Sequence, residues 1–231
     1  MNELALTPID TSAISATEKV FRSLYDAVVS LRLPPGTKVS ETEVAGQLGV
    51  SRQPVRDAFF RLSKLGFLSI RPQRATLIRP ISERAVLDAL FTRTAIEVEC
   101  LRLAIKRLDD TGLARLRDNL AEQADALRCG LRAEFHALDE ALHETICDIA
   151  GHRHAWTLIL EQKAHMDRVR FMTLSEGRRH RVLAEHKAII TAVEQRDPSE
   201  AERRLRDHIG DIRTVLAAAR IQYPDYFEVH D

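Results

Sequence analysis

Four side chains in the second half of the sequence, Asp139, His143, His186 and His208, are of types that bind divalent metal ions. Asp139 and His143 are four residues apart, so on a helix both project from one face. His186 and His208 lie in two later amphipathic segments. A carboxylate and three imidazoles from three helices are typical of a metal site inside a helical bundle. Because the chain holds 9 histidines, the same residues also fit ordinary core or surface positions.

A second group of side chains, in the first third of the sequence, has the chemistry of DNA recognition. The segment SRQPVR places Arg52, Gln53 and Arg56 near the N-terminal end of a predicted helix, where a recognition helix contacts base edges. Arginine bonds guanine bidentately and glutamine does the same with adenine. Ser51 and Thr42 lie near helix N-termini and are expected to contact phosphates.

The elements that carry these residues follow the order helix, turn, helix, wing. A first helix is expected over about 17–31, and Ser40 begins a second with a capping box. Gly49 suits the left-handed position of the turn that precedes the recognition helix. Two β-prone stretches flank Arg71 and Arg74, which are expected to reach the minor groove or the DNA backbone. The alternative for these arginines is a solvated surface. Val55, Phe59 and Leu62 are the expected core stripe of the recognition helix.

The charge of the chain is divided between its two parts. Residues 1–80 hold 11 Lys/Arg against 7 Asp/Glu, whereas residues 81–231 hold 23 against 27. A basic first part attracts phosphate even though the formal net charge of the whole chain is zero.

Composition indicates a soluble cytoplasmic protein with no membrane partner. No apolar run approaches the ~18 residues of a membrane span, and the N-terminal residues lack the pattern of a secretory signal. The 3 cysteines are scattered without CxxC spacing, which fits thiols in a reducing compartment.

The fold is predicted to be mainly α, with a winged helix-turn-helix over residues 1–80 and an all-α bundle over 81–231. Apolar residues in the second part recur at helical spacing, and no β-type alternation is seen. Residues 79–82 are a candidate hinge between the two. Weak breaks divide the bundle into about six helices, near 83–107, 111–128, 132–149, 152–173, 178–196 and 198–219.

The segment PPGTKVSETEVAGQLGVSRQPVRDAFFRLSKLGFLSIRPQRATLI resembles the winged helix-turn-helix of the GntR superfamily. The resemblance implies that Arg52, Gln53 and Arg56 enter the major groove and that the wing assists. The chain departs from the family pattern at Ala75, where a glycine is usual, so the role of Arg74 is less secure. Thr42 replaces an arginine that some relatives use on DNA.

Residues 83–217 resemble the FadR-type ligand-binding domain called FCD, through RTAIEVECLRLA, FHALDEALHETICDIAG and HRVLAEHKAIITAVEQRDPSEAERRLRDHI. The resemblance implies that Asp139, His143, His186 and His208 bind a metal. Zinc, nickel and manganese all suit this mixed nitrogen and oxygen set. Arg93 matches an arginine that pairs with a ligand carboxylate, with a surface ion pair to Glu97 as the alternative. Arg168 or Arg170 is a further candidate for the pocket.

The chain is expected to be a transcriptional regulator that acts as a repressor. It is expected to bind a palindromic double-stranded DNA operator as a homodimer. A small carboxylate effector at the metal-containing pocket is expected to control that binding. One alternative is a regulator in which the metal ion itself is the signal. Another is a metallohydrolase fused to a DNA-binding domain, but the sequence has no nucleophile elbow or phosphate loop, and no enzyme is expected.

Overall fold

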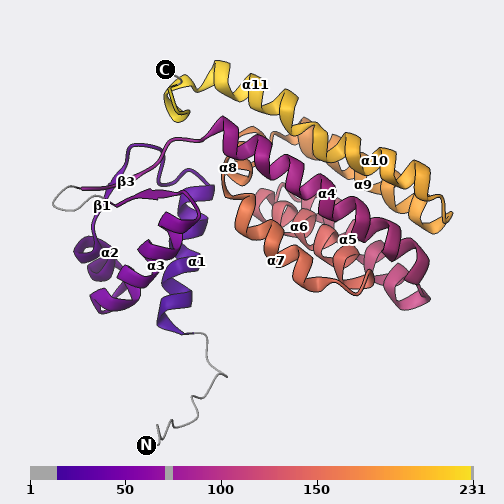
Figure 1. The fold of residues 1–231 in the computed structure, drawn as a ribbon, viewed down its shortest axis with the longest axis horizontal. Coiled ribbons are helices and arrows are strands. Elements are labelled where there is room, and N and C mark those ends of the chain that lie inside the picture. Colours follow the sequence, from indigo (N-terminus) through magenta and orange to yellow (C-terminus); the bar gives the residue numbers. More distant parts are fainter. Residues whose placement is uncertain (1–14, 71–74, 230–231) are drawn as a thin grey trace, which may run out of the picture.

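The computed structural model describes residues 15–70 and 75–229 and divides into two parts that lie side by side (Figure 1). The predicted wing residues Arg71 and Arg74 lie outside the described residues. As expected, the first part is a winged helix-turn-helix and the second is helical.

The winged part has three helices and a small antiparallel sheet. Its helices are α1 (Ala16–Val29), α2 (Glu41–Leu48) and α3 (Arg52–Lys64). Its strands are β1 (Lys38–Val39), β2 (Leu68–Ser69) and β3 (Thr76–Ile78), in the order β1-β3-β2. In register, Lys38 faces Leu77 and Leu68 faces Ile78.

Local signals explain the turn before α3. The hydroxyl of Ser40 accepts a hydrogen bond from the Glu43 N–H at 3.1 Å, which caps α2. Gly49 ends α2 in the left-handed conformation, with φ 64°, where a side chain would be strained. Val55, Phe59 and Leu62 are buried as predicted, so the opposite face of α3 is left to solvent.

The helical part runs from α4 to α11 and then a short 3₁₀ turn, η1 (Pro224–Tyr226). Its helices are α4 (Glu83–Arg107), α5 (Asp110–Arg128), α6 (Arg132–Ile149), α7 (Arg153–Gln162), α8 (Ala164–Thr173), α9 (Glu176–Glu194), α10 (Pro198–Gly210) and α11 (Ile212–Gln222).

Two of the six predicted helices are each split in the structure. The helix predicted over 152–173 breaks at Lys163 into α7 and α8, and the one predicted over 198–219 breaks at Asp211 into α10 and α11. Lys163 is buried, and its ammonium contacts the carboxylates of Glu140 and Asp167. This break is imposed by tertiary contacts, because no glycine or proline marks it in the sequence.

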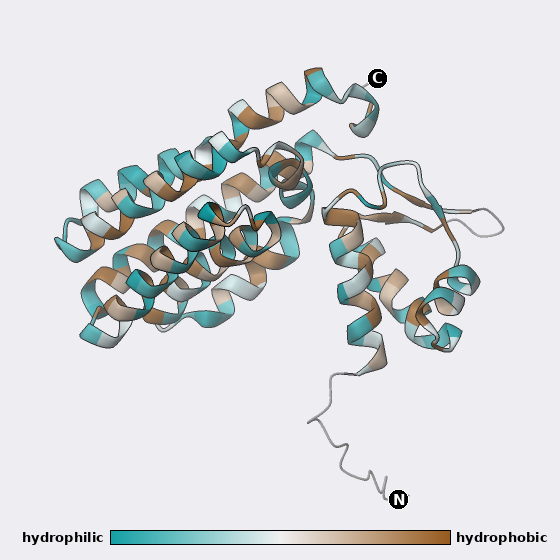
Figure 2. Ribbon diagram, turned by 180° about the vertical axis from the view of Figure 1, so that it is seen from behind, coloured by the Kyte–Doolittle hydropathy of each residue, from teal (hydrophilic) through white to brown (hydrophobic). Residues whose placement is uncertain are grey.

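Each part has its own apolar core. Figure 2 shows apolar residues alternating with hydrophilic ones along the helices of both parts. Two residues of α8 belong to the core of the winged part: Ala164 is buried in it, and the partly buried Phe171 packs against it. The linker of residues 79–82 is tied to the C-terminal segment, since the Ile81 N–H donates to the Tyr226 carbonyl at 2.7 Å. Helix α8 and the end of the chain therefore both contact the junction between the parts.

Candidate metal centre and nucleic-acid interface

The four predicted metal ligands converge inside the helical part. Asp139 and His143 come from α6, His186 from α9 and His208 from α10. One nitrogen or oxygen from each side chain lies within 4.8 Å of the others, and all four residues are buried. The four-residue spacing on α6 puts its two side chains on the face that packs toward α9 and α10.

The facing atoms of this cluster are only partly paired with one another. The Nε2 atoms of His186 and His208 lie 3.3 Å apart, and His186 Nε2 lies 3.4 Å from Asp139 Oδ1. Within the part of the chain that the structure describes, His143 Nε2 and Asp139 Oδ1 are buried without a hydrogen-bond partner. Buried polar atoms left unpaired cost about 1–3 kcal/mol each. A divalent cation among these donors would remove that cost, so the residues fit a metal ion.

A further side chain holds the outer nitrogen of each imidazole. The Nδ1 contacts are Gln123 Oε1 for His186 at 2.8 Å, Glu185 Oε2 for His208 at 2.8 Å, and Glu97 Oε2 for His143 at 2.6 Å. Contacts of this kind orient metal-binding imidazoles and leave Nε2 for the ion.

Sequence reasoning missed these three partners. Glu185 directly precedes His186 on α9, but its side chain reaches His208 on α10. Gln123 is on α5, 63 residues before its partner, and has no local signal. Of the three partners, only Glu97 has a local signal in the sequence, which is its four-residue spacing from Arg93.

The surroundings hold the ligands in the charge states that a metal requires. Burial lowers the pKa of His208 to about 3, and burial and the neighbouring His208 hold the pKa of His186 well below its ordinary value. Burial raises the pKa of Asp139, but Arg170 and the imidazoles outweigh it, and the net pKa is well below the usual range. Neutral imidazoles and an ionised carboxylate are the forms that coordinate metals.

Arg93 lies beside this cluster and is buried. Its Nε donates to Glu97 Oε1 at 2.6 Å, so the pair considered as the alternative does form, but inside the protein. Its Nη1 lies 3.5 Å from the sulfur of Met166, and its Nη2 is buried without a partner among the described residues. One donor of the guanidinium is thus available to an acceptor.

Arg168 does not lie where it was expected. Its Nη1 donates to the carbonyl of Arg79 in the linker at 2.8 Å, and its guanidinium lies 5.9 Å from the ring centroid of Phe67. The arginine of α8 at the cluster is Arg170, with Nη2 2.5 Å from Asp139 Oδ2. Two positions along a helix turn a side chain by roughly 200°, so the two arginines face opposite sides.

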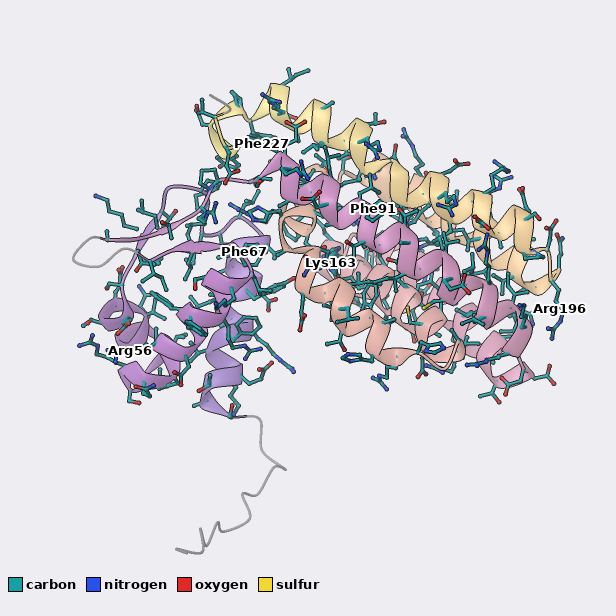
Figure 3. All side chains as sticks on the ribbon, in the orientation of Figure 1. Arg56, Phe67, Phe91, Lys163, Arg196 and Phe227 are labelled. Carbon is teal, nitrogen blue, oxygen red and sulfur yellow. The ribbon has the colours of Figure 1, made fainter. Side chains whose placement is uncertain are left out.

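The predicted DNA-reading residues lie on the surface of the winged part. Arg52 and Arg56 are about 60% exposed on α3, and Figure 3 shows Arg56 at the edge of the molecule away from the helical part. Both arginines contact one carboxylate, Glu41, at 3.1 and 3.3 Å. The Gln53 amide donates to Asp57 at 2.9 Å. The two predicted phosphate contacts, Ser51 and Thr42, are exposed.

Sequence reasoning did not anticipate the role of Glu41. Its pKa is lowered, first by the hydrogen bond from Arg56, so it stays charged while it holds both arginines. This carboxylate thus contacts both of the arginines that are predicted to meet base edges.

Comparison with protein families identifies both parts. The profile of bacterial regulatory proteins of the gntR family matches residues 16–78, and the FCD domain profile matches residues 88–211. The HTH-type transcriptional repressor RspR of Escherichia coli (strain K12) is 33% identical over 211 residues, which cover 91% of this chain and 92% of that protein. The probable D-xylose utilization operon transcriptional repressor of Paenarthrobacter nicotinovorans is 29% identical over 182 residues, 78% and 79% of the two chains.

Solved structures share the fold. E. coli McbR/YncC superposes with a TM-score of 0.76 at 20% identity, over 91% of this chain and 100% of that one. A putative GntR transcriptional regulator from Rhodococcus sp. RHA1 gives 0.72 at 20% identity, over 89% and 99%. Over the described residues, no helix has the length and apolar character needed to cross a membrane.

These matches cover both parts in the order that the sequence predicted. The family consists of DNA-binding regulators and not of enzymes, so a metallohydrolase is set aside. The chain belongs to the GntR family of bacterial regulatory proteins, carries an FCD domain, and is a DNA-binding transcriptional regulator.

Proposed function

We propose that this regulator is a repressor whose operator binding is controlled by a small organic acid at a metal-containing pocket in the helical part. The observation that carries the proposal is the buried convergence of Asp139, His143, His186 and His208, two of whose facing atoms have no hydrogen-bond partner among the described residues. Two relatives named as repressors support the sign of the control. The domain boundary at residues 80 and 81 belongs to the same proposal.

The same four residues would hold a Zn²⁺, Ni²⁺ or Mn²⁺ ion. When bound, the ion supplies a positive charge to which a carboxylate oxygen can coordinate. Glu97, Gln123 and Glu185 orient the imidazoles from behind. The protein would thus present a preorganised set of donors, which loses little conformational freedom when it is filled.

Arg93 is the proposed partner of the acid. Its unpartnered Nη2 is buried near the cluster, and a guanidinium binds a carboxylate through two parallel hydrogen bonds. Glu97 already neutralises part of its charge, so the acid would share Arg93 with Glu97. Arg170, whose Nη2 lies 2.5 Å from Asp139 Oδ2, is a second cation at this place.

DNA binding is assigned to the exposed face of α3, with Arg52, Gln53 and Arg56 on base edges and with Ser51 and Thr42 on phosphates. The predicted contacts of Arg71 and Arg74 in the wing remain part of this proposal. A homodimer in the cytoplasm would place two copies of α3 on a palindromic operator. The acid changes operator affinity only if it binds the two arrangements of the winged parts unequally.

The experiment is native mass spectrometry and metal analysis of the purified chain, followed by thermal unfolding with a panel of small carboxylic acids. We expect one bound divalent ion per chain and a rise in the unfolding temperature when an acid is added. Arg93→Met should make this rise smaller, because the carboxylate of the acid loses its partner. Arg84→Met, an exposed arginine paired with Asp88 on the same helix, is the matched control. A wild-type chain that is purified without metal and binds none of the divalent ions tested would contradict the proposal.

The second candidate function is a metal sensor, in which the ion alone is the signal. The cluster favours it in one respect, because four ligand side chains from three helices converge within 4.8 Å of one another. The two functions differ in what moves operator affinity. If the ion alone shifts that affinity and no acid shifts it further, the metal sensor is correct.

A further inference from the structure

Helix α8 has two different faces. Met166 and Arg170, four residues apart, point toward the metal cluster: Met166 contacts Arg93, and Arg170 contacts Asp139. His165 and Arg168, three residues apart, point toward the winged part and the linker. Residues three or four apart share a face of a helix, so α8 is in contact with the proposed metal pocket on one side and with the DNA-binding part on the other.

The face of α8 that points toward the winged part holds the linker by two hydrogen bonds between side chains of α8 and backbone groups of the linker. His165 Nδ1 accepts from the Ser82 N–H at 3.2 Å, and Arg168 donates to the Arg79 carbonyl at 2.8 Å. Gly66 lies so close to His165 that a Cβ there would be 2.8 Å from its Nε2. Only a glycine lets the chain before β2 pass at this distance.

A third residue of α8 reaches the first helix of the winged part. Asp167 Oδ2 accepts from the hydroxyl of Tyr25 on α1 at 3.0 Å, and it also contacts the Lys163 ammonium at 2.6 Å. Asp167 and Lys163 are each only 1% exposed. The junction is therefore polar and buried, and directional hydrogen bonds hold it.

This junction is not fully satisfied. Among the described residues, Arg168 Nε, Arg168 Nη2 and Asp167 Oδ1 are buried without a hydrogen-bond partner. Burial lowers the pKa of Arg168 to about 10, which reflects the poor solvation of its charge. An interface with several unpaired buried groups lies closer in free energy to other arrangements than a fully paired one does.

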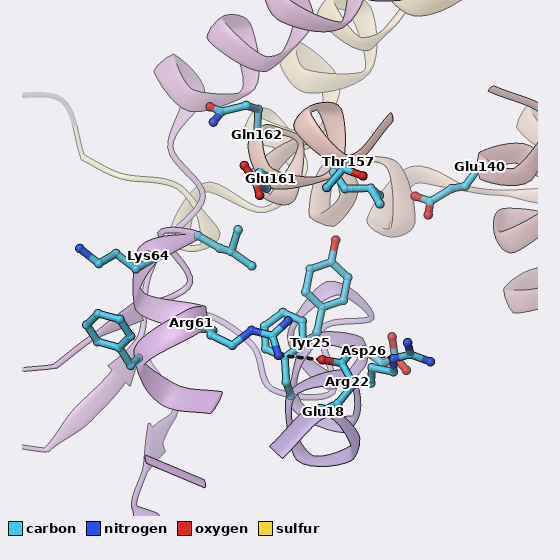
Figure 4. A pocket seen from close by; sticks show the side chains of 14 residues that line it. Glu18, Arg22, Tyr25, Asp26, Arg61, Lys64, Glu140, Thr157, Glu161 and Gln162 are labelled. Atoms are coloured by element: carbon cyan, nitrogen blue, oxygen red, sulfur yellow. Dashed lines mark hydrogen bonds and ion pairs between the residues drawn. The ribbon is translucent and has the colours of Figure 1, made fainter. Parts of the chain in front are cut away.

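Beside the junction there is room for the winged part to move. A groove of about 590 Å³ separates α1 and α3 from α7, with Tyr25, Arg61 and Lys64 on one wall and Thr157 and Glu161 on the other (Figure 4). No ion pair joins the two walls in the described part of the chain. The two parts are thus packed together at α8 and separated at α7.

From these contacts we infer that α8 is the element that transmits the state of the metal pocket to the DNA-binding part, which pivots on the Arg168 and His165 contacts and opens or narrows the α7 groove. The inference rests on the proposed function and names its route of regulation. A change at Asp139 or Arg93 moves Arg170 and Met166, and the same rigid helix then moves the contacts to Arg79, Ser82 and Tyr25. One short helix, α8, thus contacts both the proposed metal pocket and the winged part.

The test is hydrogen–deuterium exchange of the full chain with and without Zn²⁺ alone. In the wild type, we expect Zn²⁺ to slow exchange in α6 peptides and also to change it in peptides covering residues 16–30 and 75–82. Arg168→Met should keep the α6 effect and reduce the change in the winged peptides by at least roughly threefold, because the side chain no longer holds the linker. Tyr25→Phe, which removes one hydroxyl, should reduce it by less.

The matched control is Arg196→Met. Arg196 also donates to backbone carbonyls, those of Ile105 and Leu108, at 2.9 Å, but it lies at the far end of the helical part (Figure 3). In this variant, Zn²⁺ should change hydrogen–deuterium exchange in the winged peptides as much as it does in the wild type. If Arg168→Met and Tyr25→Phe both leave the winged peptides responding fully, the inference is overturned while the metal site stands. If the wild type binds no Zn²⁺, the proposed function falls and this inference falls with it.

Discussion

The two sites of this regulator hold their charged side chains in opposite ways. On the winged part, Arg52 and Arg56 are exposed and share a single carboxylate, Glu41. In the helical part, the imidazoles are buried, and each has its own partner behind it. Exposed ion pairs contribute little and rearrange at small cost, whereas buried donors keep one geometry. The side chains of the surface site can thus adjust to the shape of a large partner. The buried site is suited to a small ion that needs prearranged ligands.

The largest expected effect is on the buried site. His186→Ala should lower metal affinity by more than about 100-fold, since loss of an outer partner alone costs about 10–100-fold. Calorimetric titration with Zn²⁺ measures this. His180→Ala is the control, because His180 is exposed on the same helix and should leave the affinity unchanged. Equal affinities in the two variants would mean that the buried cluster is not the metal site.

A smaller effect is expected on the surface site. Arg56→Ala should weaken specific operator binding by about 1–3 kcal/mol through loss of a bidentate base contact, while metal content and fold stay the same. Fluorescence anisotropy with operator and with unrelated DNA separates specific from non-specific affinity. Arg84→Ala removes an exposed, ion-paired arginine of α4 and should have no effect. If the Arg56 variant keeps its specificity for the operator, α3 is not the helix that reads the bases.

The partners behind the imidazoles allow a finer comparison. Gln123→Met keeps the volume of the side chain but removes the contact to His186 Nδ1, and we expect about 10-fold weaker metal binding. The measurement is competition with a chelator of known affinity. Gln195→Met at the exposed end of α9 is the control. An unchanged affinity would show that burial alone, without the outer contact, orients His186.

The smallest effect concerns Glu41. Glu41→Gln removes the charge that holds Arg52 and Arg56, so affinity for any duplex should rise by a few-fold, consistent with the ~0–1 kcal/mol of an exposed ion pair. Salt titration should show a steeper slope, because more cationic charge faces the phosphates. Glu43→Gln, at an exposed position two residues further along α2, is the comparison variant. A fall in affinity would instead assign Glu41 a direct role in positioning the arginines.

Most of the fold was predictable because its signals are local. Ser40 caps α2 as predicted, and Val55, Phe59 and Leu62 are buried at helical spacing. The break at Lys163 was missed because it has no local signal. It depends on Glu140, which is 23 residues away in sequence.

The candidate sites were predictable in their residue types but not in their connections. The metal ligands and the arginines of α3 could be named from chemistry, spacing and family resemblance. Gln123 behind His186, and Arg168 at the linker, depend on which helices meet in space, and periodicity does not report that. The same limit hid the role of Glu41, whose partners are 11 and 15 residues away.

The central claim is that the buried site controls the surface site, and operator affinity measured in metal-free and metal-loaded protein, each with and without the stabilising acid, tests it most directly. For the wild type, we expect metal and acid together to change the operator Kd by about 5–150-fold, the usual range of allosteric coupling. His186→Ala should bind the operator with one affinity under all four conditions. If the wild type also shows one affinity throughout, the two sites are independent and the account is wrong.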